Sequence, residues 1–62
     1  MVKFIILTLS NDNEKIYVNP NQICVFYKIN DDTVIQFTDR IDYFVVKETP
    51  VEIMNMINNL SR

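Results

Sequence analysis

The feature that most limits this chain is that it has no means of cross-linking its own fold. Its 62 residues include one cysteine, Cys24, and no histidine, so neither an internal disulfide nor a Cys/His metal site can form. A domain of this length buries only a thin hydrophobic core and commonly gains stability from disulfides, metals or partner subunits. Because the first two are excluded, we expect the protein to be a homo-oligomer.

The surroundings of the cysteine also indicate a compartment. Cys24 lies in the apolar run Ile-Cys-Val-Phe at residues 23–26, which suits a reducing environment, so we expect a cytoplasmic protein. The apolar segment at the start of the chain ends at Thr8, so it is too short to be a signal peptide. No stretch reaches the roughly 20 apolar residues of a membrane span, and we expect no membrane partner.

The charge balance argues against a nucleic-acid surface. Six Lys and Arg residues stand against eight Asp and Glu residues, for a net charge of −2, and the cations are spread singly along the chain. Binding to the phosphate backbone normally needs clustered cations. A nucleic-acid-binding regulator is therefore the weakest of the non-enzymatic alternatives.

Hydrophobic alternation predicts a β-rich domain. In residues 22–29, Ile23, Val25 and Tyr27 alternate with Cys24 and Phe26, which is the period of a strand. Turn-forming Asn and Asp clusters separate five such segments, and with no glycine in the chain they must supply any positive φ that the turns need. We expect a single α+β domain over residues 1–62, with an antiparallel meander of strands at about 3–10, 15–19, 22–29, 33–38 and 41–47.

The pattern changes to a helical one near the end of the chain. Thr49, Pro50 and Glu52 form a capping-box sequence with proline in the first turn. Apolar residues then recur at helical spacing, at Ile53, Met56, Ile57 and Leu60. This predicts a helix over about residues 50–60 that packs on the sheet, because so short a helix is marginal alone.

Several of these segments together resemble one family. They are Ile-Tyr-Val-Asn-Pro at residues 16–20 followed by Ile23, Asp-Thr-Val-Ile at 32–35, residues 43–48 and Val51. Over most of the chain this arrangement is similar to the FlbD family of small proteins, which are encoded among bacterial flagellar genes, with similar short proteins in bacteriophages and mobile elements. The resemblance implies the architecture given above and assigns no activity, cofactor or site residue.

The inventory of reactive side chains is poor. Histidine, the commonest general base, is absent, and there is no glycine-rich phosphate loop. Alternation places Cys24 in mid-strand among apolar neighbours, which predicts a buried structural thiol. The Asn and Asp turns offer too few ligands for calcium. We therefore expect no enzyme, no cofactor and no metal site.

One pattern exceeds what a small domain needs. The first, third and fifth strands are apolar on both faces, whereas a sheet covered by one helix should bury only one. Either the sheet curls into a small barrel or its second face meets another subunit, and we favour the subunit. The alternation defines the candidate oligomer interface as Phe4, Ile6, Cys24, Phe26, Phe44 and Val46, opposite Ile5, Leu7, Val25, Tyr27, Tyr43 and Val45.

These observations favour a protein-interaction module that self-associates through its sheet and holds a protein partner. The runner-up is a phage or mobile-element inhibitor that caps a host protein or sequesters a small ligand. The residues do not separate the two hypotheses, because both need only a binding surface.

Overall fold

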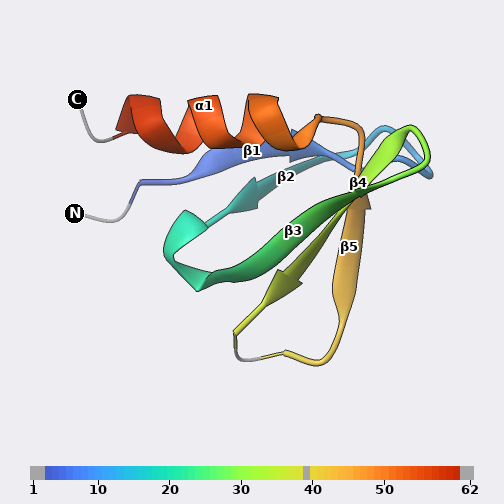
Figure 1. Cartoon of the computed structure of the whole chain (residues 1–62), viewed down its shortest axis with the longest axis horizontal. Coiled ribbons are helices and arrows are strands. Elements are labelled where there is room, and N and C mark those ends of the chain that lie inside the picture. The colour runs from blue at the N-terminus through green and yellow to red at the C-terminus, as the bar shows by residue number, and fades with distance from the viewer. Residues whose placement is uncertain (1–2, 39, 61–62) are drawn as a thin grey trace.

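A computed structural model describes residues 3–38 and 40–60. Its elements are β1 (Ile5–Thr8), β2 (Lys15–Val18), the 3-10 helix η1 (Pro20–Gln22), β3 (Ile23–Ile29), β4 (Asp32–Phe37), β5 (Tyr43–Val46) and α1 (Pro50–Leu60). The predicted α+β class, with antiparallel strands and one C-terminal helix, is confirmed (Figure 1). Four strands are shorter than the sequence predicts, most of all β1, whereas β4 has the predicted length and begins one residue earlier.

Asparagine forms the tight turns of this glycine-free chain, as predicted. Asn13 lies in the loop between β1 and β2 with a φ of 61°, and Asn30 begins the loop between β3 and β4 with a φ of 54°. The first loop is closed by hydrogen bonds from the Leu9 N–H to the Glu14 carbonyl at 2.8 Å and from the Asn13 N–H to the Leu9 carbonyl at 3.1 Å. Asparagine tolerates the left-handed region better than most residues, so both hairpins form without glycine.

The strands do not form one continuous meander, because β2 and β3 do not pair with each other. β1 and β2 form one sheet, and β3, β4 and β5 form another in that order. Pro20 begins η1 here, and the Asn19 side chain caps it by accepting a hydrogen bond from the Asn21 N–H at 3.0 Å. A proline donates no ladder hydrogen bond, and the turn carries the chain away from β2 before β3 begins.

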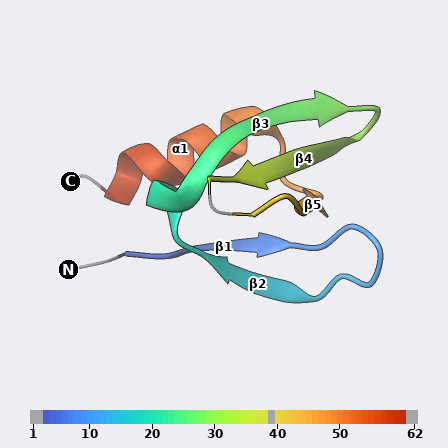
Figure 2. The same ribbon diagram turned by 90° about the horizontal axis from the view of Figure 1, so that it is seen from below.

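The two sheets meet at one corner instead, where β1 ends beside β5. Leu9 forms an isolated antiparallel bridge with Val46. On either side of it, the Ser10 N–H donates to the Val45 carbonyl at 3.0 Å and the Lys47 N–H donates to the Thr8 carbonyl at 2.9 Å. The strands therefore follow the order β2-β1-β5-β4-β3 around a curled, half-open sheet, with the hairpin facing the three-stranded sheet across the core (Figure 2).

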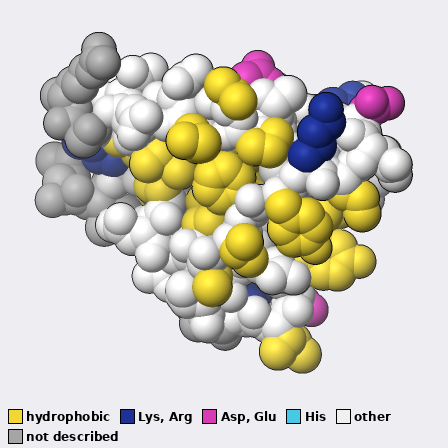
Figure 3. Space-filling view, viewed as in Figure 1, with side chains coloured by type: hydrophobic (Ala, Val, Ile, Leu, Met, Phe, Trp, Pro, Cys, Tyr) yellow, Lys and Arg dark blue, Asp and Glu magenta, His cyan; other side chains and the backbone are white. Residues whose placement is uncertain are grey.

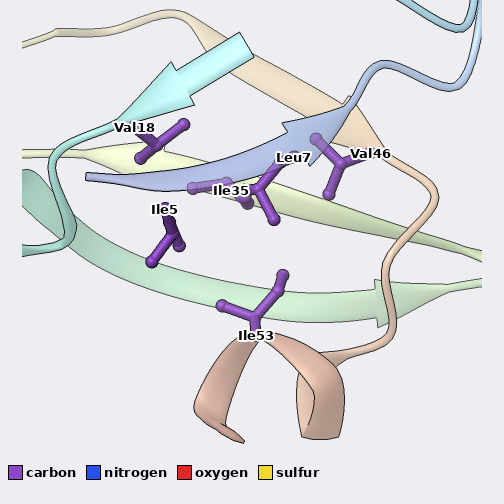
Figure 4. Packing of buried hydrophobic residues seen from close by; sticks show 6 residues of the cluster. All are labelled: Ile5, Leu7, Val18, Ile35, Val46 and Ile53. Carbon is purple, nitrogen blue, oxygen red and sulfur yellow. The ribbon is translucent and has the colours of Figure 1, made fainter. Parts of the chain in front are cut away.

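The core fills the space between these layers and the helix. Six buried side chains from β1, β2, β4, β5 and α1 converge there: Ile5, Leu7, Val18, Ile35, Val46 and Ile53 (Figure 4). Ile53 is the buried residue of α1 and points into the cluster. The helix thus closes one side of the curled sheet.

The helix begins as predicted and is held at both ends. The Glu52 N–H donates to Thr49 Oγ1 at 3.1 Å, and the Thr49 N–H donates to Glu52 Oε1 at 2.9 Å, which is the reciprocal capping box. At the other end, Lys3 Nζ donates to the Leu60 carbonyl at 2.9 Å, where a cation is favoured by the helix dipole. In the part of the chain described, no helix has the length and apolar character needed to cross a membrane.

Candidate functional site

The structure separates the six residues of the interface predicted from the sequence. Phe4, just before β1, and Ile6, within it, are exposed, whereas Val46 is fully buried in the core and Phe26 packs against the core. Phe44 is half-buried, on the same side of β5 as Val46. The six residues do not share one face.

The reason lies in the register between β1 and β5. Alternation within each strand is as expected, but Leu9 stands opposite Val46, which places Ile5 and Leu7 on the same side of the curled sheet as Val46. A shift of one residue between strands exchanges their faces. The alternation of each strand alone does not fix this register. The interface predicted from the sequence therefore combined residues on the outer side of β1 with residues on the inner sides of β3 and β5.

Cys24 departs from its predicted environment as well. The ladder between β3 and β4 is irregular between Ile23 and Val25, and Cys24, in the bulge, is exposed. The prediction of a buried structural thiol is therefore wrong, because a bulge inserts a residue that the alternation does not count.

An apolar second face does exist, on the three-stranded sheet. Cross-strand pairing aligns Tyr27, Val34 and Val45 in one row and Val25, Gln36 and Tyr43 in the next. These rows point away from the core, since their strand neighbours Ile35 and Val46 belong to it. We call Val25, Tyr27, Val34, Tyr43 and Val45 the outer face.

The outer face is well packed at its centre and open around it. Val34 is only 4% exposed although it lies outside the core cluster, while Tyr27 is 45% and Tyr43 59% exposed. Neither row contains a charged side chain. Hydrophobic side chains also gather over β3 and between it and the helix (Figure 3).

A groove runs beside β2, on the side of the core that α1 does not close. Its volume is about 580 Å³; β2 and Asn19 line one side, and Gln22, Phe37, Arg40 and Phe44 line the other. The rings of Phe37 and Phe44 meet edge to face with centroids 5.6 Å apart. The Arg40 guanidinium carbon lies 5.4 Å from the centre of the Phe44 ring, within the range of a cation–π contact.

A polar network that the sequence did not predict holds the corner between β1 and β5. Glu48 accepts hydrogen bonds from the Thr8 N–H at 2.9 Å and from Thr8 Oγ1 at 3.0 Å. Lys15 Nζ donates to Thr8 Oγ1 at 2.7 Å, and Thr33 Oγ1 donates to the Glu48 carbonyl at 2.6 Å. Thr8 and Thr33 are both buried.

This network has the features of a structural clasp. The hydrogen bonds of Glu48 join segments that are far apart in the chain, whereas that of Lys15 lies within the β1–β2 hairpin. Buried hydroxyls need such partners. Thr8, a polar residue that interrupts an apolar segment, was the sequence signal that could have suggested it. Among the described residues, no group of three Cys, Asp or Glu side chains could hold a metal ion.

Comparisons with known proteins give no relative. No family model matches the chain, and neither a curated protein nor a solved structure matches it significantly. The chemistry of the outer face and of the groove is therefore the basis for the function.

Proposed function

We propose that this protein is a non-enzymatic interaction module that self-associates through the outer face of its three-stranded sheet. The observation that carries the proposal is the uncharged, tyrosine-bearing surface formed by the two rows across β3, β4 and β5. The centres of protein interfaces are depleted in charged residues and enriched in tyrosine.

The arrangement of this surface also supports self-association. Val34 is already covered by its neighbours, so the outer face has a packed centre between two partly exposed tyrosines. Tyrosine buries a large area with few rotatable bonds and has a hydroxyl that can bond across an interface. A two-fold contact would set this self-complementary patch against its copy.

Self-association would also compensate for the small hydrophobic core. The core cluster has six buried side chains. With a single cysteine, the chain cannot add an internal disulfide. Burial of apolar area contributes roughly 25 cal/mol per Å². A second subunit would therefore add the kind of stabilisation that the monomer lacks.

The proposal extends to a cytoplasmic protein that holds a protein partner. Its cations favour this over a nucleic-acid role, because Lys3 and Lys15 donate hydrogen bonds within the fold to Leu60 and Thr8. The resemblance to the FlbD family contributes an architecture here and no partner.

Charge placed in the outer face tests the proposal. Tyr27→Glu and Tyr43→Glu should each lower the molar mass measured by light scattering after size exclusion, while circular dichroism shows a retained fold. Ile41→Glu is the matched control, because Ile41 is fully exposed and lies outside the outer face. An oligomer that survives both tyrosine changes in folded protein would place the interface elsewhere.

A further inference from the structure

The β2 strand presents a free edge to the groove. The Leu9 N–H donates to the Glu14 carbonyl, and Leu7 and Ile5 stand opposite Ile16 and Val18 along the same ladder. Hydrogen-bonded and non-hydrogen-bonded pairs alternate along an antiparallel ladder. The backbone groups of Ile16 and Val18 therefore face β1, and those of Lys15 and Tyr17 face away from it.

No strand within the described chain takes this edge. β2 belongs to a two-stranded sheet, and the next segment turns away through η1. The Asn19 carbonyl is used by the Gln22 N–H at 3.0 Å, so the edge is open from Lys15 to Tyr17. An unpaired edge of this kind is a template for another strand.

The lining of the groove adds a chemical preference. Phe37 and Phe44 provide an aromatic wall beside Ile16 and Val18, which suits an apolar side chain. Among the described residues that line the groove, the charged ones are Lys15 and Arg40, and none is acidic. The exposed ion pair of Arg40 with Asp42, at 3.4 Å, is of a kind that contributes little, so another carboxylate can compete for the guanidinium.

We propose that the groove binds an extended peptide segment of a protein partner that adds as a strand to β2 and carries an apolar and an acidic residue two positions apart, so that both face the groove. Its backbone pairs with Lys15 and Tyr17, an apolar side chain contacts Phe37 and Phe44, and a carboxylate reaches Arg40. The site is distinct from the outer face, since Phe37 and Phe44 lie on the inner side of the curled sheet, and it goes beyond self-association by naming the chemistry of the partner.

Charge and shape favour this occupant over two others. The β2 strand of a second copy would bring another Lys15 into a groove already lined by two cations, and like charges across a strand pair are destabilising. A nucleic acid offers phosphates to Arg40 but no repeating N–H and C=O groups to the free edge, and the chain carries a net charge of −2.

The binding test uses a mixture of short, end-blocked peptides in which glutamate stands two positions from valine, isoleucine, leucine or phenylalanine, so that both side chains face the groove. It is titrated into isotope-labelled protein and followed by amide NMR. We expect shifts at the amides of β2 and at the Arg40 side chain, and much smaller shifts with the matched mixture that carries lysine in place of glutamate. The absence of shifts at β2, equal response to the lysine mixture, or a response to single-stranded oligothymidine alone would overturn the proposal.

Two pairs of variants separate backbone pairing from charge. Tyr17→Pro removes an N–H that faces away from β1, so it should abolish binding and leave the hairpin folded, whereas Tyr17→Val should bind. Arg40→Gln should weaken binding roughly tenfold, and Arg40→Lys should weaken it less. Unchanged affinity in folded Tyr17→Pro, or in Arg40→Gln, would contradict the strand-addition geometry or the carboxylate contact. Neither result depends on the oligomeric state, which light scattering reports separately.

Discussion

Thr8 and Glu48 join the first strand to the segment that leads into the helix. The Glu48 carboxylate accepts from both the backbone N–H and the hydroxyl of Thr8, at 2.9 and 3.0 Å. The Lys47 N–H bonds to the Thr8 carbonyl next to these contacts. This pair closes the curled sheet at its one joined corner, so it fixes the register that decides which side chains face the core.

Loss of the Glu48 carboxylate should destabilise the fold. Glu48→Ala removes both acceptors of the buried Thr8, and an unsatisfied buried donor costs about 1–3 kcal/mol. The free energy of unfolding from urea denaturation, at a single protein concentration, measures this. Glu14→Ala is the control, since the Glu14 side chain is exposed and has no role in the clasp. Equal stability of the two variants would mean that the corner does not depend on this carboxylate.

The helix cap gives a second expectation. Thr49→Ala should lower the free energy of unfolding by about 0.5–2 kcal/mol, because the Glu52 N–H loses its acceptor. Thr49→Ser keeps a hydroxyl at the same position and should recover most of that stability. Thermal melts of the three proteins compare them directly, and an alanine variant as stable as the serine variant would argue against the capping box.

Asn30 provides a test of the glycine-free turns. Its φ of 54° is costly for a residue with an ordinary side chain and costs nothing for glycine. Asn30→Ala should therefore destabilise the protein by about 1 kcal/mol, whereas Asn30→Gly should leave it as stable or nearly so. Urea denaturation distinguishes the two, and the reverse order of stability would contradict a left-handed Asn30.

The bulge in β3 predicts how Cys24 reacts. Because the thiol is exposed in the folded chain, a disulfide reagent such as Ellman's should modify it fully without denaturant, at a rate close to that in urea. A native rate slower by orders of magnitude would restore the buried thiol that simple alternation predicts.

Local features of this fold could be read from the sequence because their causes are local. The helix over residues 50–60 follows from Thr49, Pro50 and Glu52, and the turns follow from the absence of glycine, which leaves asparagine for positive φ. The hairpins could be predicted for the same reason. In each case the residues that specify the structure are only a few positions apart.

The candidate site was harder to predict than these local features, because it depends on contacts between distant segments. The position of Leu9 opposite Val46 reverses the expected face of β1, and the bulge at Cys24 shifts the count along β3. The groove is formed by β2 and by Phe37, Arg40 and Phe44, which only the curling of the sheet brings together. Alternation nevertheless predicted that β3 and β5 would be apolar on both sides, which is the basis of the outer face.

The oligomeric state and the choice of face can be measured together. Sedimentation equilibrium of the wild type, Tyr27→Glu and Ile6→Glu over micromolar concentrations compares the outer face with Ile6, an exposed residue of β1 that the sequence had placed in the interface. We predict that the wild type and Ile6→Glu reach at least twice the 7.4 kDa of one chain, whereas folded Tyr27→Glu remains at the mass of one chain. A wild type that stays at 7.4 kDa throughout, or a loss of assembly in Ile6→Glu but not in Tyr27→Glu, would contradict self-association through the outer face.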